Sequence, residues 1–444
     1  MNSSDSTPTP APSSPNSAPD PPAAEAAAPA PKCWSDYTHF AGFDWAKDHH
    51  NVIIVDRAGQ IVADFEFAHS GPGWQQWRTQ IAPFAETLAV TVETSQGVVI
   101  ECLLAAGATV FPIAPLSAKA YRQRKKPSGT KTDRDDAWSM ADALRLDGHG
   151  WRALAAEDPH LAELRLLCRD EQALIEERTA LINQLQAALH EYYPCAEEAF
   201  DDWTSPHAWA FISTFPTPQA LAKAGRRKWE KFLHSRKLSR PETYARRMAI
   251  FERALEFVAS DATTRAKSLL ALARVRVLVT LEQQLTSYRA QIERLFAEHP
   301  DHHLFGSLPG AGPKLGPRLL AEIGSDRARF PQPQSLQTYA GTAPVSYQSG
   351  QINKVLLRRQ CNRGLRHTVH LFANLSRAGC AWAETYYRAK RAQGKSHAQA
   401  LRCLGQRWLK IIWKMLQTSK PYDAELHAKN QILHGSWVLK LNAA

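Results

Sequence analysis

Two aspartates, Asp133 and Asp136, stand three residues apart at the start of a run of good helix formers. Residues at this spacing project from the same face of a helix, and two like charges held so close repel each other. Asp135 adds a third acid, but on a helix it points about 100° away from Asp136. The pair is therefore either an acidic first turn capped by Thr132, which the helix dipole favours, or half of a cation site.

Two further carboxylates, Asp44 and Glu93, each end an apolar segment that is typical of a β-strand. Functional groups gather at strand ends in open sheets, and Asp133 and Asp136 lie on the helix that would close such a sheet. Four converging carboxylates, here called the carboxylate quartet, need a compensating charge, and their oxygens favour Mg²⁺ or Mn²⁺. Two such ions would stabilise the attacking and leaving oxygens of a phosphodiester, so we predict metal-assisted phosphodiester chemistry.

The elements that position the quartet fall within residues 35–150. Short segments joined by tight connections predict three antiparallel strands, and a continuous apolar run after a helix predicts a buried parallel strand. A further helix and strand precede the helix of Asp133, so the predicted fold is α/β with a mixed sheet. The predicted strands are 39–44, 51–56, 61–67, 88–92 and 108–113, and the predicted helices begin near Gly73 and Gly97.

Residues 151–300 have helical character. The segment 161–193 has helix-spaced apolar residues without Gly or Pro, and apolar residues from 278 to 295 alternate steps of three and four, as in a coiled coil. We expect these two long helices to pair with each other or with another subunit, and the spacing leaves both open. Basic residues at 226–228 and 246–247 could face nucleic acid, although a solvated helix face is the default interpretation.

Residues 301–425 combine a glycine turn with a polar loop. Gly310 and Gly312 lie in a Pro-Gly-Ala-Gly-Pro turn that would present backbone N–H groups to a phosphate, as in a helix-hairpin-helix. Such turns also occur for packing reasons. In the polar loop 346–351, Ser346 and Ser349 are equal candidates for a nucleophile on chemistry alone. Neither has a neighbouring histidine in sequence, but an adjacent metal site could lower the pKa of the hydroxyl.

Basic residues gather in two places, and aromatic residues accompany the second group, as on nucleic-acid surfaces. The 54 Lys and Arg exceed the 43 Asp and Glu, giving a charge of +11 and a pI near 9.3. This surplus favours a polyanion partner, although basic surfaces also suit membranes or acidic proteins. The residues expected to contact nucleic acid are Arg122, Arg124, Lys125 and Lys126 in a basic loop, Gly310 and Gly312, and Lys354, Arg358, Arg359, Arg363 and Arg366.

The two ends and the cysteines limit the class of protein. Residues 1–34 are rich in Pro, Ala and Ser and are expected to be disordered, and residues 426–444 are expected to form a loose tail. Seven cysteines without a C-x-x-C pair argue against a zinc ribbon or a disulfide framework and indicate a reduced, cytoplasmic protein. No apolar run approaches the roughly 20 residues of a membrane helix, and no signal-peptide pattern is present.

The motifs around the quartet and in residues 301–425 resemble the insertion-sequence one-ten family of transposases, to which the pilin-gene invertases are related. That family carries D-E-D-D residues in a RuvC-like domain and a serine in a second domain. The resemblance covers roughly residues 38–423. The segments that carry it are 42–44, 92–97, 131–137, 309–313, 339–341, 349–350, 361–367, 386–390 and 396–402.

The resemblance implies a RuvC/RNase H-like catalytic domain at 35–150, a helical coiled-coil region at 151–300 and a mainly α-helical transposase domain at 301–425. It implies that the quartet binds Mg²⁺ or Mn²⁺ and that Ser349 is the nucleophile, forming a phosphoserine link to DNA. The implied partners are donor and target DNA and a non-coding guide RNA that pairs with both. It also implies a homo-oligomer, a dimer or tetramer with composite active sites, which would act at the bacterial nucleoid.

Two other functions fit the same residues. A metal-dependent nuclease selective for DNA structure, like a Holliday-junction resolvase, would need only the quartet and an activated water. A non-catalytic nucleic-acid-binding protein would use the basic residues and keep the acids for structure. The residues alone do not reveal a guide RNA, because base pairing leaves no sequence code in the protein.

Overall fold

The computed structural model describes residues 32–126, 129, 131–154 and 158–435. The chain divides into two compact units, Met1–Ala156 and Glu157–Ala444. Most of the segment 1–34, expected to be disordered, and the end of the expected tail, 436–444, lie outside the described residues. The folded part includes Trp34, whose ring lies 5.5 Å from that of Phe40 and 5.6 Å from that of Phe111. Trp34, the last residue of the segment expected to be disordered, is therefore part of the folded unit.

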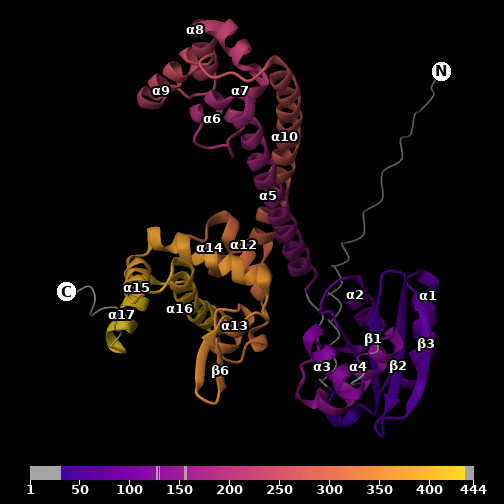
Figure 1. Ribbon diagram of the computed structural model, residues 1–444. Helices are drawn as coiled ribbons and strands as arrows, with labels where there is room; N and C mark the ends of the chain where they lie inside the picture. The colour runs from indigo at the N-terminus through magenta and orange to yellow at the C-terminus, as the bar shows by residue number, and fades with distance from the viewer. Residues whose placement is uncertain (1–31, 127–128, 130, 155–157, 436–444) are drawn as a thin grey trace, which may run out of the picture. The chain divides into compact units, whose positions relative to one another are not determined.

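The first unit is built on a five-stranded sheet in the order β3-β2-β1-β4-β5 (Figure 1). The first three strands form the predicted antiparallel meander, whereas β1 and β4, and β4 and β5, pair in parallel. The sequence prediction of a mixed sheet is therefore confirmed. The strands are β1 (His39–Trp45), β2 (His49–Asp56), β3 (Ile61–Ala68), β4 (Leu88–Val92) and β5 (Thr109–Pro112).

The helices of this unit correct one prediction. The basic segment expected to be a loop at 121–129 is largely the end of helix α3, and the described residues of that segment leave the helix only at Lys126. Pro115 starts this helix at a position where the missing N–H costs nothing, and no breaker follows before Pro127. The α-helices are α1 (Gly71–Ile81), α2 (Val98–Ala105), α3 (Pro115–Lys125) and α4 (Asp133–Asp147), and the 3₁₀ turns are η1 (Trp34–Asp36), η2 (Ala82–Phe84) and η3 (Gly148–Gly150).

Both faces of the sheet are covered, because side chains alternate along each strand. Ala41 and Phe43 of β1 join the buried cluster that includes residues of α1 and α2, whereas Phe40 packs with Ala137 and other residues of α4. Gly42 allows helix α4 to pack closely against strand β1. A Cβ at Gly42 would lie 1.8 Å from the carbonyl oxygen of Ala137, so only glycine fits at this crossing.

The second unit contains two long helices, α5 (Pro159–Tyr192) and α10 (Asp261–Glu298), which pack against each other in opposite directions. Arg178 of α5 lies 2.5 Å from Glu282, and Arg274 of α10 donates to the carbonyl of Gln184 at 2.6 Å. The later residues of α5 thus meet the earlier residues of α10. Of the two pairings left open by the sequence, the structure shows the one within the chain.

Four helices gather at one end of this pair (Figure 1). In the two basic segments that could face nucleic acid, residues 226–228 and 246 are exposed, as on the solvated helix face taken as the default, whereas Arg247 is structural. Arg247 is buried and donates to the carbonyl of Ala199 at 3.0 Å, and the neighbouring basic run ends at the buried Trp229. The helices are α6 (Pro194–Ala199), α7 (Pro206–Thr214), α8 (Pro218–Ser235) and α9 (Pro241–Glu252).

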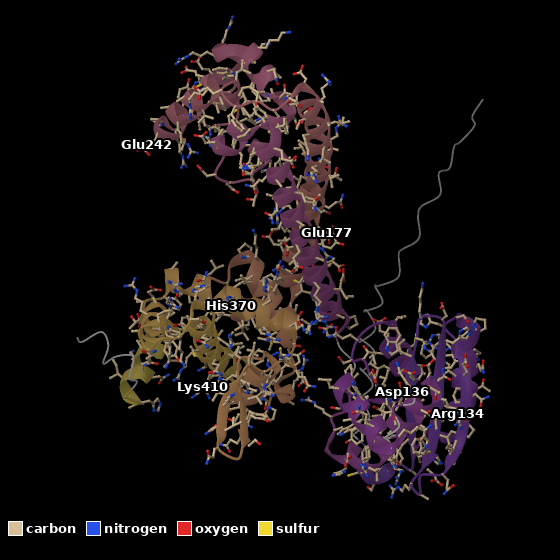
Figure 2. All side chains as sticks on the ribbon, viewed as in Figure 1. Arg134, Asp136, Glu177, Glu242, His370 and Lys410 are labelled. Atoms are coloured by element: carbon tan, nitrogen blue, oxygen red, sulfur yellow. The ribbon has the colours of Figure 1, made fainter. Side chains whose placement is uncertain are left out.

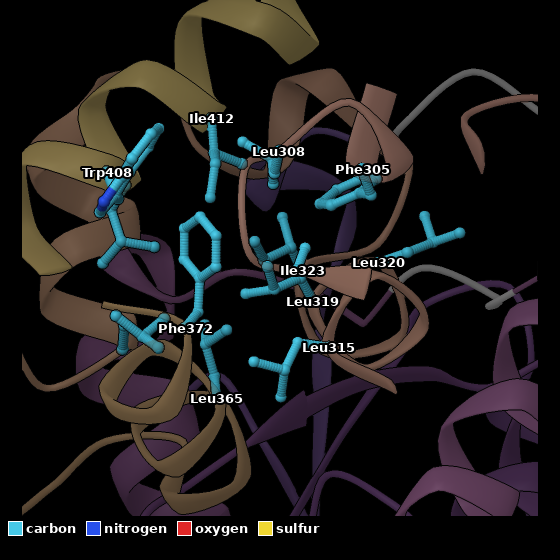
Figure 3. Close-up of a cluster of buried hydrophobic side chains, with 14 of the residues drawn as sticks. Phe305, Leu308, Leu315, Leu319, Leu320, Ile323, Leu365, Phe372, Trp408 and Ile412 are labelled. Atoms are coloured by element: carbon cyan, nitrogen blue, oxygen red, sulfur yellow. The ribbon is translucent and has the colours of Figure 1, made fainter. Parts of the chain in front are cut away.

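At the other end, the remaining helices enclose a large apolar core (Figure 3). Phe305, Leu319, Phe372 and Trp408 are all fully or almost fully buried in it. The polar loop predicted at 346–351 is instead part of a β-hairpin, and the expected tail begins with a helix. The elements are α11 (His302–Gly306), α12 (Gly312–Ile323), η4 (Arg327–Arg329), α13 (Pro333–Tyr339), β6 (Val345–Ser349), β7 (Ile352–Leu356), α14 (Arg363–Gly379), α15 (Ala381–Ala392), α16 (His397–Thr418) and α17 (Ala424–Leu433).

A buried polar network joins α5 to this core. Arg169 of α5 lies 2.8 and 2.9 Å from the two carboxylate oxygens of Glu322 in α12. Glu322 also accepts a hydrogen bond at 2.6 Å from Asn362, whose own oxygen caps α14 by accepting from the backbone N–H of Leu365. A second buried acid on α5, Glu171, pairs with Arg318 of α12 at 2.8 Å. These bonds fix the helix pair to the start of α14.

Candidate active site

Asp44 and Glu93 are neighbours because of the parallel register of β1 and β4. Phe43 is paired with Val92, and Asp44 and Glu93 are the next residue of each chain segment. By the two-residue period of a strand, Asp44 shares the face of Phe40 and Gly42, which is the face covered by α4. Both side chains are half-buried. The sheet thus brings these two carboxylates together beneath the start of one helix.

The other two carboxylates come from the first turn of α4. Asp133 is the first residue of this helix and is exposed, whereas Asp136 is only 7% exposed. Thr132 caps the helix by accepting a hydrogen bond from the backbone N–H of Asp135 at 3.1 Å. The helix-cap interpretation of this sequence is therefore correct, and it is compatible with the quartet, because the cap is made by Thr132 and does not use the carboxylates of Asp133 and Asp136.

The quartet members affect one another electrostatically. Burial, followed by the charges of Asp133, Asp136 and Glu93, raises the pKa of Asp44 to about 7. Burial and the charge of Asp136 also raise the pKa of Glu93, against the opposing effect of Arg122 and Lys131. Burial and neighbouring negative charge both disfavour the ionised form of an acid. The structure therefore places all four acids within one local field.

The positively charged side chain of Arg122 already lies beside one of the four acids. Arg122 of α3 contacts both carboxylate oxygens of Asp136, whose position is labelled in Figure 2, at 2.5 and 2.7 Å. Within the described residues, no three His, Cys, Asp or Glu side chains are already arranged around one point as metal ligands. The donor set still fits a divalent cation, because it supplies hard oxygens and excess negative charge. A bound ion would share or compete for the carboxylate oxygens of Asp136 with Arg122.

The other basic residues of α3 also face the acids of α4. Lys125 pairs with Asp142 at 2.7 Å, and Lys126 pairs with Asp135 at 2.5 Å. Arg124 is exposed, and no carboxylate in the described part of the chain pairs with it. Of the four residues expected to contact nucleic acid here, three are therefore engaged within the domain.

Ser349 belongs to the other compact unit, at the tip of the β6–β7 hairpin. It is the last residue of β6 and pairs with Ile352, so Gly350 and Gln351 form the two-residue turn. Gly350 has a φ of 55°, the positive value that glycine adopts readily at the first position of such a turn. The Ser349 side chain is exposed, as is that of Ser346 near the start of the strand. The hairpin thus leaves Ser349 exposed in the last strand pair before the turn.

The remaining predicted contacts lie around the hairpin and at α12. Lys354 and Arg359 are exposed, and Arg366 donates to the sulfur of Cys361 at 2.7 Å. Gly310 has a packing role, because a Cβ there would lie 2.9 Å from the backbone of α14, whereas Gly312 faces open space. Arg358 contacts the carbonyl of Ala343, and Arg363 opens α14 as an exposed residue.

Both units match known transposase families. Residues 41–194 match the transposase family defined by the D-E-D-D domain of IS110, and residues 302–388 match the transposase IS116/IS110/IS902 family. A Streptomyces coelicolor protein assigned as the mini-circle transposase for IS117 is 33% identical over 415 residues, covering 88% of this chain and 97% of that protein.

The chain belongs to the IS110 family of transposases. It is therefore an enzyme of DNA transposition, and the acidic set of this family suggests the use of a divalent metal. A protein of insertion element IS900 from Mycobacterium paratuberculosis is 30% identical, over 86% of this chain and 96% of its own length. A protein of IS110 from Streptomyces coelicolor is 29% identical, over 88% and 96%.

Several contacts in the transposase join residues that are distant in sequence, so local sequence patterns do not predict them. Arg122 was expected to face nucleic acid, and only the helical geometry of α3 shows its contact with Asp136. Asn362 lies in the segment 361–367 that carries the resemblance, but its bond to Glu322 could not be predicted, because the two residues lie far apart in sequence. In the described residues, no helix of the transposase is long and apolar enough to cross a membrane.

Proposed function

We propose that this transposase cuts and rejoins DNA strands through a phosphoserine link formed by Ser349, assisted by Mg²⁺ or Mn²⁺ bound at the quartet. The observation that carries the metal part is the pKa of Asp44, raised to about 7 by burial and by its three acidic neighbours. Such crowding favours a divalent cation as the missing counter-charge. The serine part is supported by the exposed position of Ser349 at the hairpin tip.

The proposed chemistry conserves the number of phosphodiester bonds. The Ser349 oxygen bonds to the scissile phosphorus, the bond to a deoxyribose oxygen breaks, and that oxygen leaves with a proton. Attack by a deoxyribose hydroxyl of another strand then breaks the serine–phosphorus bond and returns a proton to Ser349. A divalent cation, when bound, would lower the pKa of a nearby hydroxyl and offset developing negative charge. The chain supplies the nucleophile, and no external energy source is needed.

The proposal also covers the subunits, the nucleic-acid partners and the domains of the transposase. The quartet and Ser349 would act on the same phosphodiester from different subunits of a dimer or tetramer. A non-coding guide RNA would select donor and target DNA by base pairing, and Arg124, Lys354, Arg358, Arg359 and the exposed turn at Gly312 would contact nucleic-acid backbones. The proposed domains are 35–150 for the quartet, 151–300 for a coiled-coil region and 301–425 for the serine, with a helix-hairpin-helix contact at 309–313.

Trapping of a covalent protein–DNA adduct tests the proposal. The purified transposase, with its element DNA and any co-purifying RNA, is quenched in denaturant during the reaction, and adducts are mapped by mass spectrometry. We expect a phosphodeoxynucleotide on Ser349, lost in Ser349→Ala and retained in Ser346→Ala. The two serines lie on the same exposed strand, so the second variant is a matched control. Full strand transfer by Ser349→Ala, or cleavage without an adduct as in a hydrolytic nuclease, would contradict the serine mechanism.

A further inference from the structure

A cavity of about 380 Å³ lies where the β6–β7 hairpin joins the helical core. Thr342, three residues before β6, and Leu357, directly after β7, both line it. Its other walls come from α14 and α16, including His370, labelled in Figure 2. This volume is near the lower end of the roughly 300–1,000 Å³ typical of small-molecule sites. The cavity is therefore large enough for one small ligand at the base of the hairpin.

The ionisable side chains that line this cavity are all basic. Arg363, Arg366 and Arg402 line it together with His367 and His370, and no acidic side chain does. In the part of the chain that the structure describes, none of the three arginines forms an ion pair with a carboxylate. Arg366 donates to Cys361 and to the carbonyls of Arg358 and Arg359, none of which carries a neutralising negative charge. Guanidinium groups from two helices that lack carboxylate partners create a positive potential, which suits phosphate oxygens.

His370 lies at the cavity wall, where burial and neighbouring positive charge both disfavour its protonated form. Burial, followed by the positive fields of His397, His367 and Arg402, lowers the pKa of His370. A histidine with a lowered pKa is mostly neutral near neutral pH, and a neutral imidazole both donates and accepts a hydrogen bond. The cavity thus adds a polar group with both hydrogen-bonding capacities to its fixed positive charges.

The floor of the cavity is apolar. Val369 of α14 and Leu401 of α16 are almost completely buried, and both line the cavity. Leu357 adds a partly exposed apolar wall. A free phosphate would leave this apolar surface unused, and an acidic peptide side chain would offer it little more than one or two methylene groups. A ligand that joins an anionic group to a flat or ring-shaped apolar body uses both parts.

We propose that this cavity binds a single nucleotide unit of a nucleic-acid strand, with its phosphate at the arginines and its sugar and base against the apolar floor. The limited volume admits one nucleotide and excludes a duplex, so the bound unit is unpaired or lies at a strand end. The chemistry of the cavity is common to DNA and RNA. Held at the hairpin base, this nucleotide would fix the strand relative to the hairpin that carries Ser349.

This inference deepens the proposed function by naming a substrate subsite beside the serine hairpin. Binding of a mononucleotide requires neither the metal nor covalent chemistry, so it can be measured with EDTA present. The phosphoserine mechanism could fail while nucleotide binding stands, and the reverse is equally observable. The two proposals are therefore separable by experiment.

The test is calorimetric titration of the full-length protein, in EDTA, with 2′-deoxyuridine 5′-monophosphate, deoxyuridine and inorganic phosphate. We expect the nucleotide to bind at least about tenfold more tightly than either fragment, a difference of about 1.4 kcal/mol. A parallel titration with uridine 5′-monophosphate distinguishes whether the bound nucleotide belongs to DNA or to RNA. Tighter deoxynucleotide binding assigns the cavity to DNA, and tighter ribonucleotide binding assigns it to RNA.

Three variants locate the site. Arg402→Gln removes a cavity charge, and Leu357→Trp fills the cavity at a position that is already 46% exposed and so tolerates a larger side chain. Each should weaken nucleotide binding at least about fivefold. Lys410→Gln removes an exposed charge from the same helix outside the cavity and should leave binding unchanged. Equal affinity for phosphate and nucleotide, or unchanged binding in both cavity variants, would overturn the proposal.

Discussion

The Nη1 atom of Arg122 lies 2.5 and 2.7 Å from the two carboxylate oxygens of Asp136. This contact places a cation of the chain itself where the quartet needs positive charge. It also raises the pKa of Arg122, first through the hydrogen bond to Asp136, so the guanidinium remains charged throughout the physiological range. A divalent ion bound at the proposed quartet site would therefore compete with Arg122 for Asp136, and release of Arg122 would leave its charge available to a DNA phosphate.

Arg122→Gln should increase the affinity of the DNA-free protein for Mn²⁺ by at least about threefold, because the competing charge is lost. Titration of free Mn²⁺ by electron paramagnetic resonance measures this directly, without catalysis. Arg134→Gln is the matched control, since it removes an arginine of the same domain that pairs with the partly exposed Asp64 outside the quartet. Weaker Mn²⁺ binding by Arg122→Gln than by Arg134→Gln would show that Arg122 supports the site instead.

The stability of the metal-free protein should depend on the protonation of Asp44. Its pKa is about 7 in the folded chain and 3.8 for an unperturbed aspartate, so the folded state holds this proton between about pH 4 and 7. The contribution is fully present below pH 4 and is lost as pH rises through 7. Urea unfolding in EDTA should show a free energy of unfolding that falls over this range, and Asp44→Asn should flatten it. Identical pH profiles for the unsubstituted protein and Asp44→Asn would show that the pH dependence does not come from Asp44.

The strands and the quartet could be predicted because their signals are local. Apolar runs end at Asp44 and Glu93, and the period of two along a strand decides which face each side chain takes. Asp133 and Asp136 share a helix face by their spacing alone. The convergence of these residues then follows from parallel pairing of β1 and β4, which the buried apolar character of β4 already indicated.

The hairpin and the contact of Arg122 could not be predicted, for physical reasons. Strands are recognised by a buried face, and none of the residues of β6 or β7 is buried, so the segment carried no such alternation. The Ser-Gly pair at 349–350 was the remaining turn signal. The run of basic residues in α3 is typical of a solvated segment, and its pairing with Asp136 depends on how α3 packs against α4.

Glu322 is buried and should contribute to stability through its pairs with Asn362 and with Arg169, which is 35% exposed. Glu322→Gln removes the charge but keeps the shape, so these charge-assisted hydrogen bonds are weakened. We expect a loss of about 2 kcal/mol in the free energy of unfolding, measured with urea. Glu298→Gln breaks an exposed pair with Arg294 one helical turn away and should cost less than about 0.5 kcal/mol. Similar losses for both variants would mean that the network is dispensable.

Gly42 should prove indispensable to the carboxylate quartet, although it binds nothing. A Cβ at this position would lie 1.8 Å from the carbonyl oxygen of Ala137 and 2.6 Å from the backbone nitrogen of Ala141, so Gly42→Ala must displace α4 from β1. Because these contacts are to backbone, we expect a cost of at least about 3 kcal/mol in urea unfolding.

The same displacement should move Asp133 and Asp136 away from Asp44 and weaken Mn²⁺ binding, measured by electron paramagnetic resonance under conditions where the variant remains folded. Gly71→Ala is the control for the Gly42 variant, because a Cβ there meets no atom within 4 Å and lies at the start of a helix. It should change the free energy of unfolding by less than about 0.5 kcal/mol and leave Mn²⁺ affinity intact. If Gly42→Ala behaved like Gly71→Ala, the close crossing of α4 over β1 would not be what assembles the quartet.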